Sequence, residues 1–275
     1  MFRVATNRFQ RHGADGSDTT ADAGRWPEDL HGESQSPSVW ISRCLTEPEL
    51  ASHFSLLSAD EISKSRTLRL PGDRERYLTS RALLRLALSL TVASRLHPSA
   101  WRFSVGRFGK PEVSPGLPAV SFNLSHAGSL VVIAIDPTSP IGVDVEKLDG
   151  LGAADIPASV LSPWERSMLD RCDEAARARE FVRLWTLKEA HAKRAGLGVH
   201  LDFSSFDLDW QPGRETQTIE TNDGTLESRT IRTSDAPYQV SVALSLARNP
   251  RPVSWREVGI GDLARPWSTG REMAS

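Results

Sequence analysis

Two carboxylates stand two residues apart in the apolar stretch Ile141–Lys147, which reads Ile-Gly-Val-Asp-Val-Glu-Lys. Its β-branched residues favour a strand. Residues i and i+2 of a strand lie on one face, so Asp144 and Glu146 would point the same way, roughly 7 Å apart. Such a pair could share a hard cation or act as acid and base. The alternative is a pair of solvated charges on an open sheet face, which is the commoner case for strand carboxylates.

A serine and a histidine, Ser125 and His126, end a predicted strand just before the turn at Ala127-Gly128. A hydroxyl, an imidazole and free backbone N–H groups suit an anion. A serine nucleophile is a poor reading, because adjacent strand residues point to opposite faces and Ser125 could not easily pass its proton to His126. The alternative is a turn histidine without a role.

Residues 181–193 are typical of a helix, on which Trp185, Glu189 and Lys193 share one face at i, i+4 and i+8. The alternative is a core tryptophan followed by an ordinary Glu–Lys surface pair, which contributes only ~0.3–0.5 kcal/mol. Lys188 is one residue off this line and could face a cleft or solvent. A Gly-Lys-Pro loop holds Lys110 on a restricted backbone, although taken by itself the loop is better explained as a plain turn.

An α+β fold is predicted from the patterns along the chain. Two long helices, one from Asp73 to about residue 96 and one over 173–195, are each followed by strands, and this weak repeat has a spacing of about 100 residues. We expect two similar α/β half-domains, with 141–147 at their junction and a cleft there. The predicted division is a disordered tail over 1–38, half-domains over 39–140 and 141–247, and an extended tail over 248–275, with a strand over 205–210 in the second half.

Composition narrows the class of protein. The 275 residues are 39% hydrophobic and 25% charged, as in ordinary soluble domains, and no apolar run approaches the ~18 residues of a membrane span. The N-terminus lacks a signal-peptide pattern, and Cys44 and Cys172 lie far apart, so we expect reduced thiols and a cytoplasmic protein. Residues 58–110 carry a net charge of +7 and the remainder −9. This asymmetry predicts one anionic ligand and one cation or basic patch as partners. Nucleic acid is a poor candidate for the anion, because the basic segment lacks interleaved aromatic residues.

Four motifs occur in a fixed order. They are Gly-Lys-Pro at 109–111, Phe-Asn-Leu-Ser-His at 122–126, Ile-Gly-Val-Asp-Val-Glu at 141–146, and Leu-Trp-Thr-Leu-Lys-Glu-Ala-His-Ala-Lys at 184–193. Together they closely resemble the Sfp-type 4′-phosphopantetheinyl transferases, in the variant with Trp-x-x-Lys-Glu-Ala. The resemblance covers roughly residues 40–247 and is loose outside the motifs.

The resemblance implies a pseudo-dimer of two α/β halves with coenzyme A in the cleft between them. It implies Mg²⁺-dependent transfer of the phosphopantetheine arm to a serine of an apo carrier protein, by a chain that needs no second copy. Two other functions stay open. One is a non-catalytic homologue that binds coenzyme A or a carrier protein, and the other is a Mg²⁺-dependent phosphohydrolase.

The resemblance also assigns roles to individual residues. The implied metal ligands are Asp144, Glu146 and Glu189, and the implied catalytic residues are Glu189, Lys193 and Glu146; whether Glu146 or Glu189 contacts the metal directly stays open. Phosphate groups of coenzyme A would contact Lys110, Ser125, His126 and Lys188. Its 3′-phosphate would contact Lys64, Arg69 and Arg76, with Arg81 next. The spacing of these basic residues departs from the family pattern, and Glu61 stands near a position where the resemblance implies another cation.

Overall fold

The computed structural model describes residues 36–92, 96–106, 109–149, 156–196, 201–246 and 252–268. Most of the predicted tail over 1–38 therefore lies outside the described residues. Within these ranges no helix is long and apolar enough to cross a membrane.

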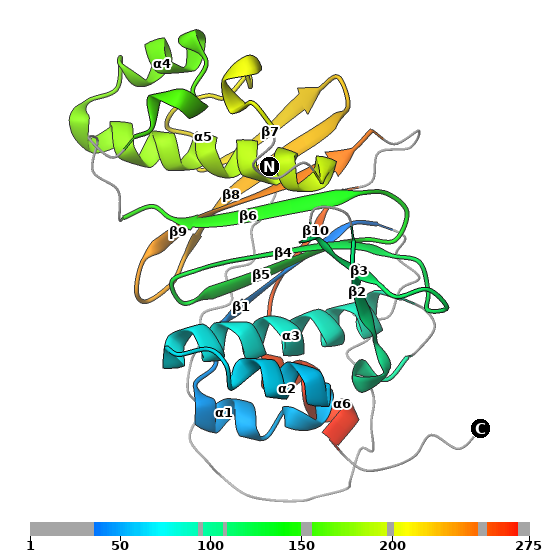
Figure 1. Cartoon of the computed structure of the whole chain (residues 1–275). Helices are drawn as coiled ribbons and strands as arrows, with labels where there is room; N and C mark the ends of the chain where they lie inside the picture. The colour runs from blue at the N-terminus through cyan, green and yellow to red at the C-terminus, as the bar shows by residue number, and fades with distance from the viewer. Residues whose placement is uncertain are drawn as a thin grey trace, which may run out of the picture.

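The first half is a four-stranded sheet covered by one long helix (Figure 1). Its strand order is β10 (Ser254–Glu257), β1 (Ser38–Arg43), β5 (Leu130–Asp136) and β4 (Ser121–Ala127). β1, β5 and β4 pair antiparallel, and β10 runs parallel to β1. The helix α3 (Pro71–Thr91) begins with a proline in its first turn, where the missing N–H has no helical partner to lose.

The second half repeats this arrangement with β6 (Ile141–Lys147), β9 (Pro237–Ser245), β8 (Gly224–Arg232) and β7 (Thr216–Thr221), all antiparallel. Its helix is α5 (Glu174–Ala195). The Asp173 side chain caps the first turn by accepting from the Ala176 amide at 2.8 Å. Gly196 ends the helix with φ +70°, a left-handed conformation that glycine adopts without a Cβ clash.

Three hydrophobic clusters separate four layers: α3, the first sheet, the second sheet and α5. Alternation along β5 divides its side chains between two of them. Val131, Ile133 and Ile135 belong to the cluster under α3, whereas Leu130, Val132 and Ala134 belong to the cluster between the sheets. The two halves are therefore joined through a continuous apolar core.

The predicted α+β class is confirmed. In each half a first strand is followed by a long helix and then by a hairpin whose second strand pairs with the first one, giving the matching orders β1-β5-β4 and β6-β9-β8. This is the topology that a pseudo-dimer requires, and the pseudo-dimer itself stays a prediction. Shorter elements complete the fold: α1 (Glu47–Ala51), α2 (Ala59–Ser65), β2 (Phe103–Val105), β3 (Pro111–Val113), α4 (Pro163–Leu169) and α6 (Ile260–Ser268).

The structures predicted for two segments are wrong. The strand predicted over 205–210 is instead a 3₁₀ turn, Phe203–Ser205, followed by irregular chain whose Leu208 and Trp210 side chains are buried against α5. The segment predicted as an extended tail contains β10 and α6, because the free edge of β1 accepts a fourth strand and Ile260, Leu263 and Ala264 fit the core beside α3. Hydrophobic alternation and strand propensity within these segments did not identify α5 or β1 as the elements that they pack or pair with.

Candidate active site

Three of the predicted site residues, Ser125, Asp144 and Lys193, meet where the two sheets touch, along β4 of the first half and β6 of the second. These strands belong to different sheets, and a side chain links them. The Asn123 Oδ1 accepts a hydrogen bond from the Val143 backbone N–H at 2.9 Å. This bond satisfies a buried donor on the outer edge of β6 and fixes the spacing of the two strands.

Alternation along β6 separates its core residues from its acids. Ile141, Val143 and Val145 enter the cluster between the sheets. Gly142 faces α5 so closely that an added Cβ would lie 2.1 Å from the Ala190 carbonyl oxygen. Only glycine permits this approach. The helix therefore lies directly over the strand, which brings Lys193 of α5 within reach of Asp144.

Asp144 is the centre of a three-residue hydrogen-bond network drawn from three elements. Its Oδ1 accepts from the Lys193 Nζ at 2.5 Å and from the Ser125 Oγ at 2.9 Å. The same ammonium lies 3.2 Å from the Ser125 Oγ. Asp144 is only 3% exposed, so this contact stabilises a carboxylate that has lost its water.

Three carboxyl groups around this network influence one another. Burial raises the pKa of Asp144, although Lys193 opposes the shift. Burial and then the charge of Asp144 raise the pKa of Glu146 to about 7, with a smaller contribution from Glu189. Burial raises the pKa of Glu189 as well, and Asp144 adds to that shift. The region is therefore one of concentrated negative charge, which a cation would relieve.

The carboxylate oxygens of these three acids are suitable ligands for a hard divalent cation, although their present positions do not form a metal site. The buried Asp144 Oδ2 has no hydrogen-bond partner among the described residues, and carboxylate oxygens are the ligands that Mg²⁺ prefers. Among the described residues, no group of three or more His, Cys, Asp or Glu side chains is gathered closely enough to hold a metal ion. The implied set of Asp144, Glu146 and Glu189 thus stays a prediction.

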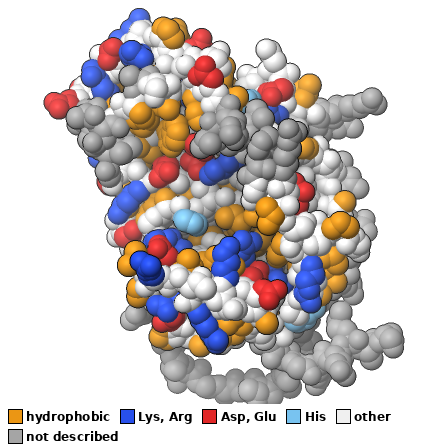
Figure 2. All heavy atoms as spheres, in the orientation of Figure 1, with side chains coloured by type: hydrophobic (Ala, Val, Ile, Leu, Met, Phe, Trp, Pro, Cys, Tyr) orange, Lys and Arg blue, Asp and Glu red, His pale blue; other side chains and the backbone are white. Residues whose placement is uncertain are grey.

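A positively charged side faces these acids. His126 is exposed at the end of β4, yet the protein around its ring and then the charges of Arg76 and Lys193 lower its pKa. Arg76, on α3, is partly exposed and forms an ion pair with Asp73. In Figure 2 acidic and basic side chains gather in the middle of the face, where the half with α5 meets the half with α3.

The other predicted basic residues lie beside α3. The Lys64 Nζ and the Arg81 guanidinium flank the Tyr77 ring, 5.7 and 5.3 Å from its centroid. Arg69 is exposed in the turn before α3. The structure therefore adds Tyr77, whose contacts with Lys64 and Arg81 were not predicted from the sequence. Glu61 has a structural role, because it caps α2 and forms a buried ion pair with Arg85 at 2.9 Å.

Lys188 does not lie at this site, which corrects the predicted phosphate contact. Its side chain is 1% exposed and its Nζ lies 2.6 Å from the Glu165 Oε2, which is also buried. The ammonium also donates to the carbonyl oxygens of Phe203 and Phe206. Because a helix turns about 100° per residue, Lys188 points into the core under α4 while Glu189 faces the acids.

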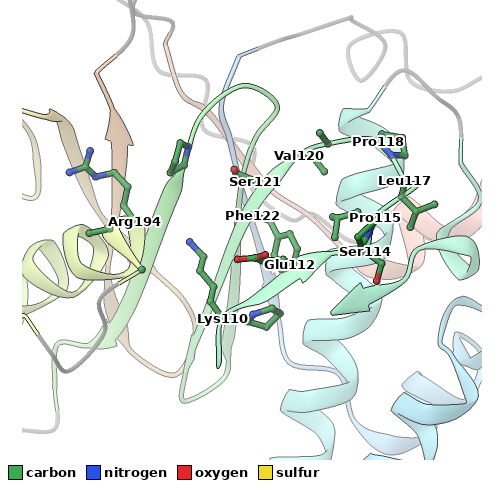
Figure 3. Close-up of a pocket in the computed structure, with 16 residues that line it drawn as sticks. Lys110, Glu112, Ser114, Pro115, Leu117, Pro118, Val120, Ser121, Phe122 and Arg194 are labelled. Carbon is green, nitrogen blue, oxygen red and sulfur yellow. The ribbon is translucent and has the colours of Figure 1, made fainter. Parts of the chain in front are cut away.

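Lys110 lies at the junction but its ammonium contacts backbone. The Nζ donates to the Lys193 carbonyl at 3.0 Å and lies 3.4 Å from the Ile141 carbonyl. Burial lowers its pKa. Lys110 also borders a cavity of about 660 Å³ between the halves, with Arg194 across from it (Figure 3). These contacts join the halves rather than leaving a free cation for phosphate.

Comparison with known proteins identifies the family of this chain. Residues 140–243 match the family model of the 4′-phosphopantetheinyl transferase superfamily. A 4′-phosphopantetheinyl transferase of Bacillus subtilis is 34% identical over 209 residues, which cover 76% of this chain and 90% of the relative. The transferase Sfp of Bacillus subtilis strain 168 is 32% identical over 170 residues, covering 62% and 74%. The transferase HetI of a Nostoc species is 29% identical over 156 residues, covering 56% and 65%.

The matched segment runs from the start of β6 through α5 to β9, so it contains the acids and Lys193. The chain therefore belongs to the 4′-phosphopantetheinyl transferase superfamily and to this class of enzyme. Within the superfamily it is of the Sfp type, as the four motifs predicted.

Proposed function

We propose that this enzyme transfers the 4′-phosphopantetheine arm of coenzyme A to a serine of an apo acyl, peptidyl or aryl carrier protein. The network of Ser125, Asp144 and Lys193 carries the proposal. It lies between an acidic wall, formed by Asp144, Glu146 and Glu189, and a basic wall, formed by His126 and Arg76. A substrate with a pyrophosphate and a separate phosphate matches that division of charge.

The proposed reaction is a single displacement. The carrier serine Oγ bonds to the β-phosphorus of coenzyme A, and the bond from that phosphorus to the bridging oxygen breaks. Adenosine 3′,5′-bisphosphate leaves with the bridging oxygen. The serine proton passes to a carboxylate, for which Glu189 is our candidate because it shares a face of α5 with Lys193 and because burial raises its pKa, which makes it a stronger base.

The chain's own cations would bind the phosphates. Lys193 is 26% exposed at its side chain, so its ammonium can contact both Asp144 and a ligand in the cleft. His126 and Arg76 would contact phosphate oxygens opposite it, with Ser125 as a further donor. Lys64, Arg69 and Arg81 are the remaining candidates for the 3′-phosphate. A Mg²⁺ ion held by Asp144, Glu146 and Glu189 would neutralise charge on the pyrophosphate.

One assay tests the function. Purified protein, Mg²⁺, coenzyme A and an apo carrier protein are incubated, and the carrier is measured by intact mass. A gain of one phosphopantetheine on the carrier serine is expected. Asp144→Asn should abolish the gain, whereas Asp209→Asn, an exposed carboxylate elsewhere, should not.

Other outcomes of the assay separate the alternatives. Coenzyme A binding without modification of several carriers would favour the non-catalytic homologue. Mg²⁺-dependent cleavage of coenzyme A in the absence of any carrier would favour the phosphohydrolase.

We further propose a cytoplasmic monomer. Cys44 and Cys172 are free thiols, as is usual in a reducing compartment. One chain supplies both walls of the site, so no second copy is needed to complete it.

A further inference from the structure

A polar cluster outside the proposed catalytic residues ties the tips of two hairpins together. It consists of Ser129, in the turn between β4 and β5, and Asp235 and Tyr238, at the turn between β8 and β9. The Tyr238 hydroxyl donates to the Asp235 Oδ2 at 2.7 Å and accepts from the Ser129 backbone N–H at 3.1 Å. The Ser129 hydroxyl donates to the Asp235 Oδ1 at 2.8 Å. We name these three residues the hairpin clamp.

The clamp is closely fitted. Tyr238 is fully buried, and a Cβ added to Gly128 would lie 2.4 Å from its hydroxyl. Gly128 also has φ +50°. The turn therefore needs glycine for two reasons, the left-handed backbone and the close approach to the Tyr238 hydroxyl. Hydrogen bonds from Thr233, Tyr238 and Ser129 lower the pKa of Asp235 to about 2, which keeps it ionised.

The clamp joins the two halves next to the proposed site. Ser129 follows His126 by three residues on the first half. On the second half Tyr238 pairs in register with Lys147, the residue after Glu146, and the Lys147 Nζ lies 4.0 Å from the Asp235 Oδ2. The bond from Val143 to Asn123 crosses the same junction on the other side of Asp144. The contact between Ser125 and Asp144 therefore lies between two side-chain bridges.

We propose that Tyr238 and Asp235 are positioning residues for coenzyme A, because the hairpin clamp fixes His126 of the first half relative to Glu146 of the second. The proposal rests on the proposed function. A ligand that contacts both halves binds only the arrangement in which their walls are correctly spaced. Loosening the clamp populates other spacings, and the apparent dissociation constant rises as the competent fraction falls.

The experiment measures coenzyme A binding by calorimetry, together with kcat and KM for coenzyme A. Tyr238→Phe removes one hydroxyl and keeps the buried ring, and Asp235→Asn weakens the other side of the clamp. We expect the dissociation constant and KM to rise about 3- to 10-fold, as for a competent fraction of roughly 0.1–0.3, with a smaller change in kcat at saturating coenzyme A.

Ser89→Ala is the matched control. It removes a buried hydrogen bond from the Trp101 indole, 2.9 Å, that lies wholly within the first half. It should lower the melting temperature as Tyr238→Phe does, but leave coenzyme A affinity unchanged, which separates positioning from general loss of stability. Unchanged affinity in folded Tyr238→Phe and Asp235→Asn would overturn this proposal alone. Failure of the unaltered protein to bind coenzyme A would overturn the proposed function as well.

Discussion

Breaking the buried ion pair between Lys188 and Glu165 should strongly destabilise the protein without affecting its ligand site. Both side chains are essentially inaccessible, at 1% and 0% exposure, and their charged atoms lie 2.6 Å apart. Lys188→Met leaves the Glu165 carboxylate in the core, where the described part of the chain offers it the amides of Ser162 and Leu208. Removing one partner of such a pair costs about 3–5 kcal/mol.

A second variant tests the physical reason. Glu165→Gln keeps an acceptor for the Ser162 amide, and Lys188 keeps its carbonyl acceptors, so the cost should be smaller, about 1–3 kcal/mol. The double variant Lys188→Met/Glu165→Gln buries no charge, so it should be more stable than Lys188→Met alone.

Thermal and denaturant unfolding measure these differences. A loss of 3–5 kcal/mol corresponds to a fall in melting temperature of about 6–20 °C in a chain of this size. A loss below about 1 kcal/mol for Lys188→Met would refute the buried environment. Well below its melting temperature, Lys188→Met should bind coenzyme A within about twofold of the unaltered protein, which is ~0.4 kcal/mol. Much weaker binding would instead restore the sequence-based prediction of a phosphate contact.

Three further predictions concern the site. Asp144→Ala should abolish transfer while circular dichroism shows an intact fold, and retained activity would contradict the metal assignment. Gly142→Ala should lower the free energy of unfolding by about 1–3 kcal/mol or more, because the added Cβ would clash with the backbone of α5. Its transferase activity should fall as well. An unaffected variant would mean that α5 can move away from β6 freely. Glu146 has a folded pKa of about 7, above the ordinary 4.5, so its contribution to stability is present below about pH 4.5 and is lost as pH rises through 7. Melting temperatures from pH 5 to 8 should therefore fall less steeply for Glu146→Gln, and equal slopes would disprove the shift.

Local sequence signals predicted the elements that depend on local chemistry. The alternation along 141–147 predicts β6 with its observed bounds, and the long helix expected over 173–195 is α5. α5 ends where expected, because Gly196 follows it in the left-handed conformation that glycine adopts readily. Each signal lies within a few residues of the structure that it forms.

The errors came from partners far away in the chain. Lys188 has the spacing of a residue beside a catalytic helix face, but Glu165 and the carbonyls of 203 and 206 determine its environment. The 205–210 segment has strand-forming residues, yet it pairs with none of the described strands, and its aromatic side chains pack in the cluster beneath α5. The bond of Asn123 to Val143 and the hairpin clamp likewise join segments whose proximity no local pattern encodes.

Because of the strand β10, the first half cannot finish folding before the second half has been synthesised. It follows the whole second half in the chain but pairs with β1 of the first, and its Trp255 contacts Glu227 and Arg229 of β8. The first sheet cannot be completed on the ribosome until the second half has emerged. A fragment ending near 247 would leave the edge of β1 unpaired and open to other strands. If the first half is expressed alone, the fragment should therefore include residues 252–268 as well.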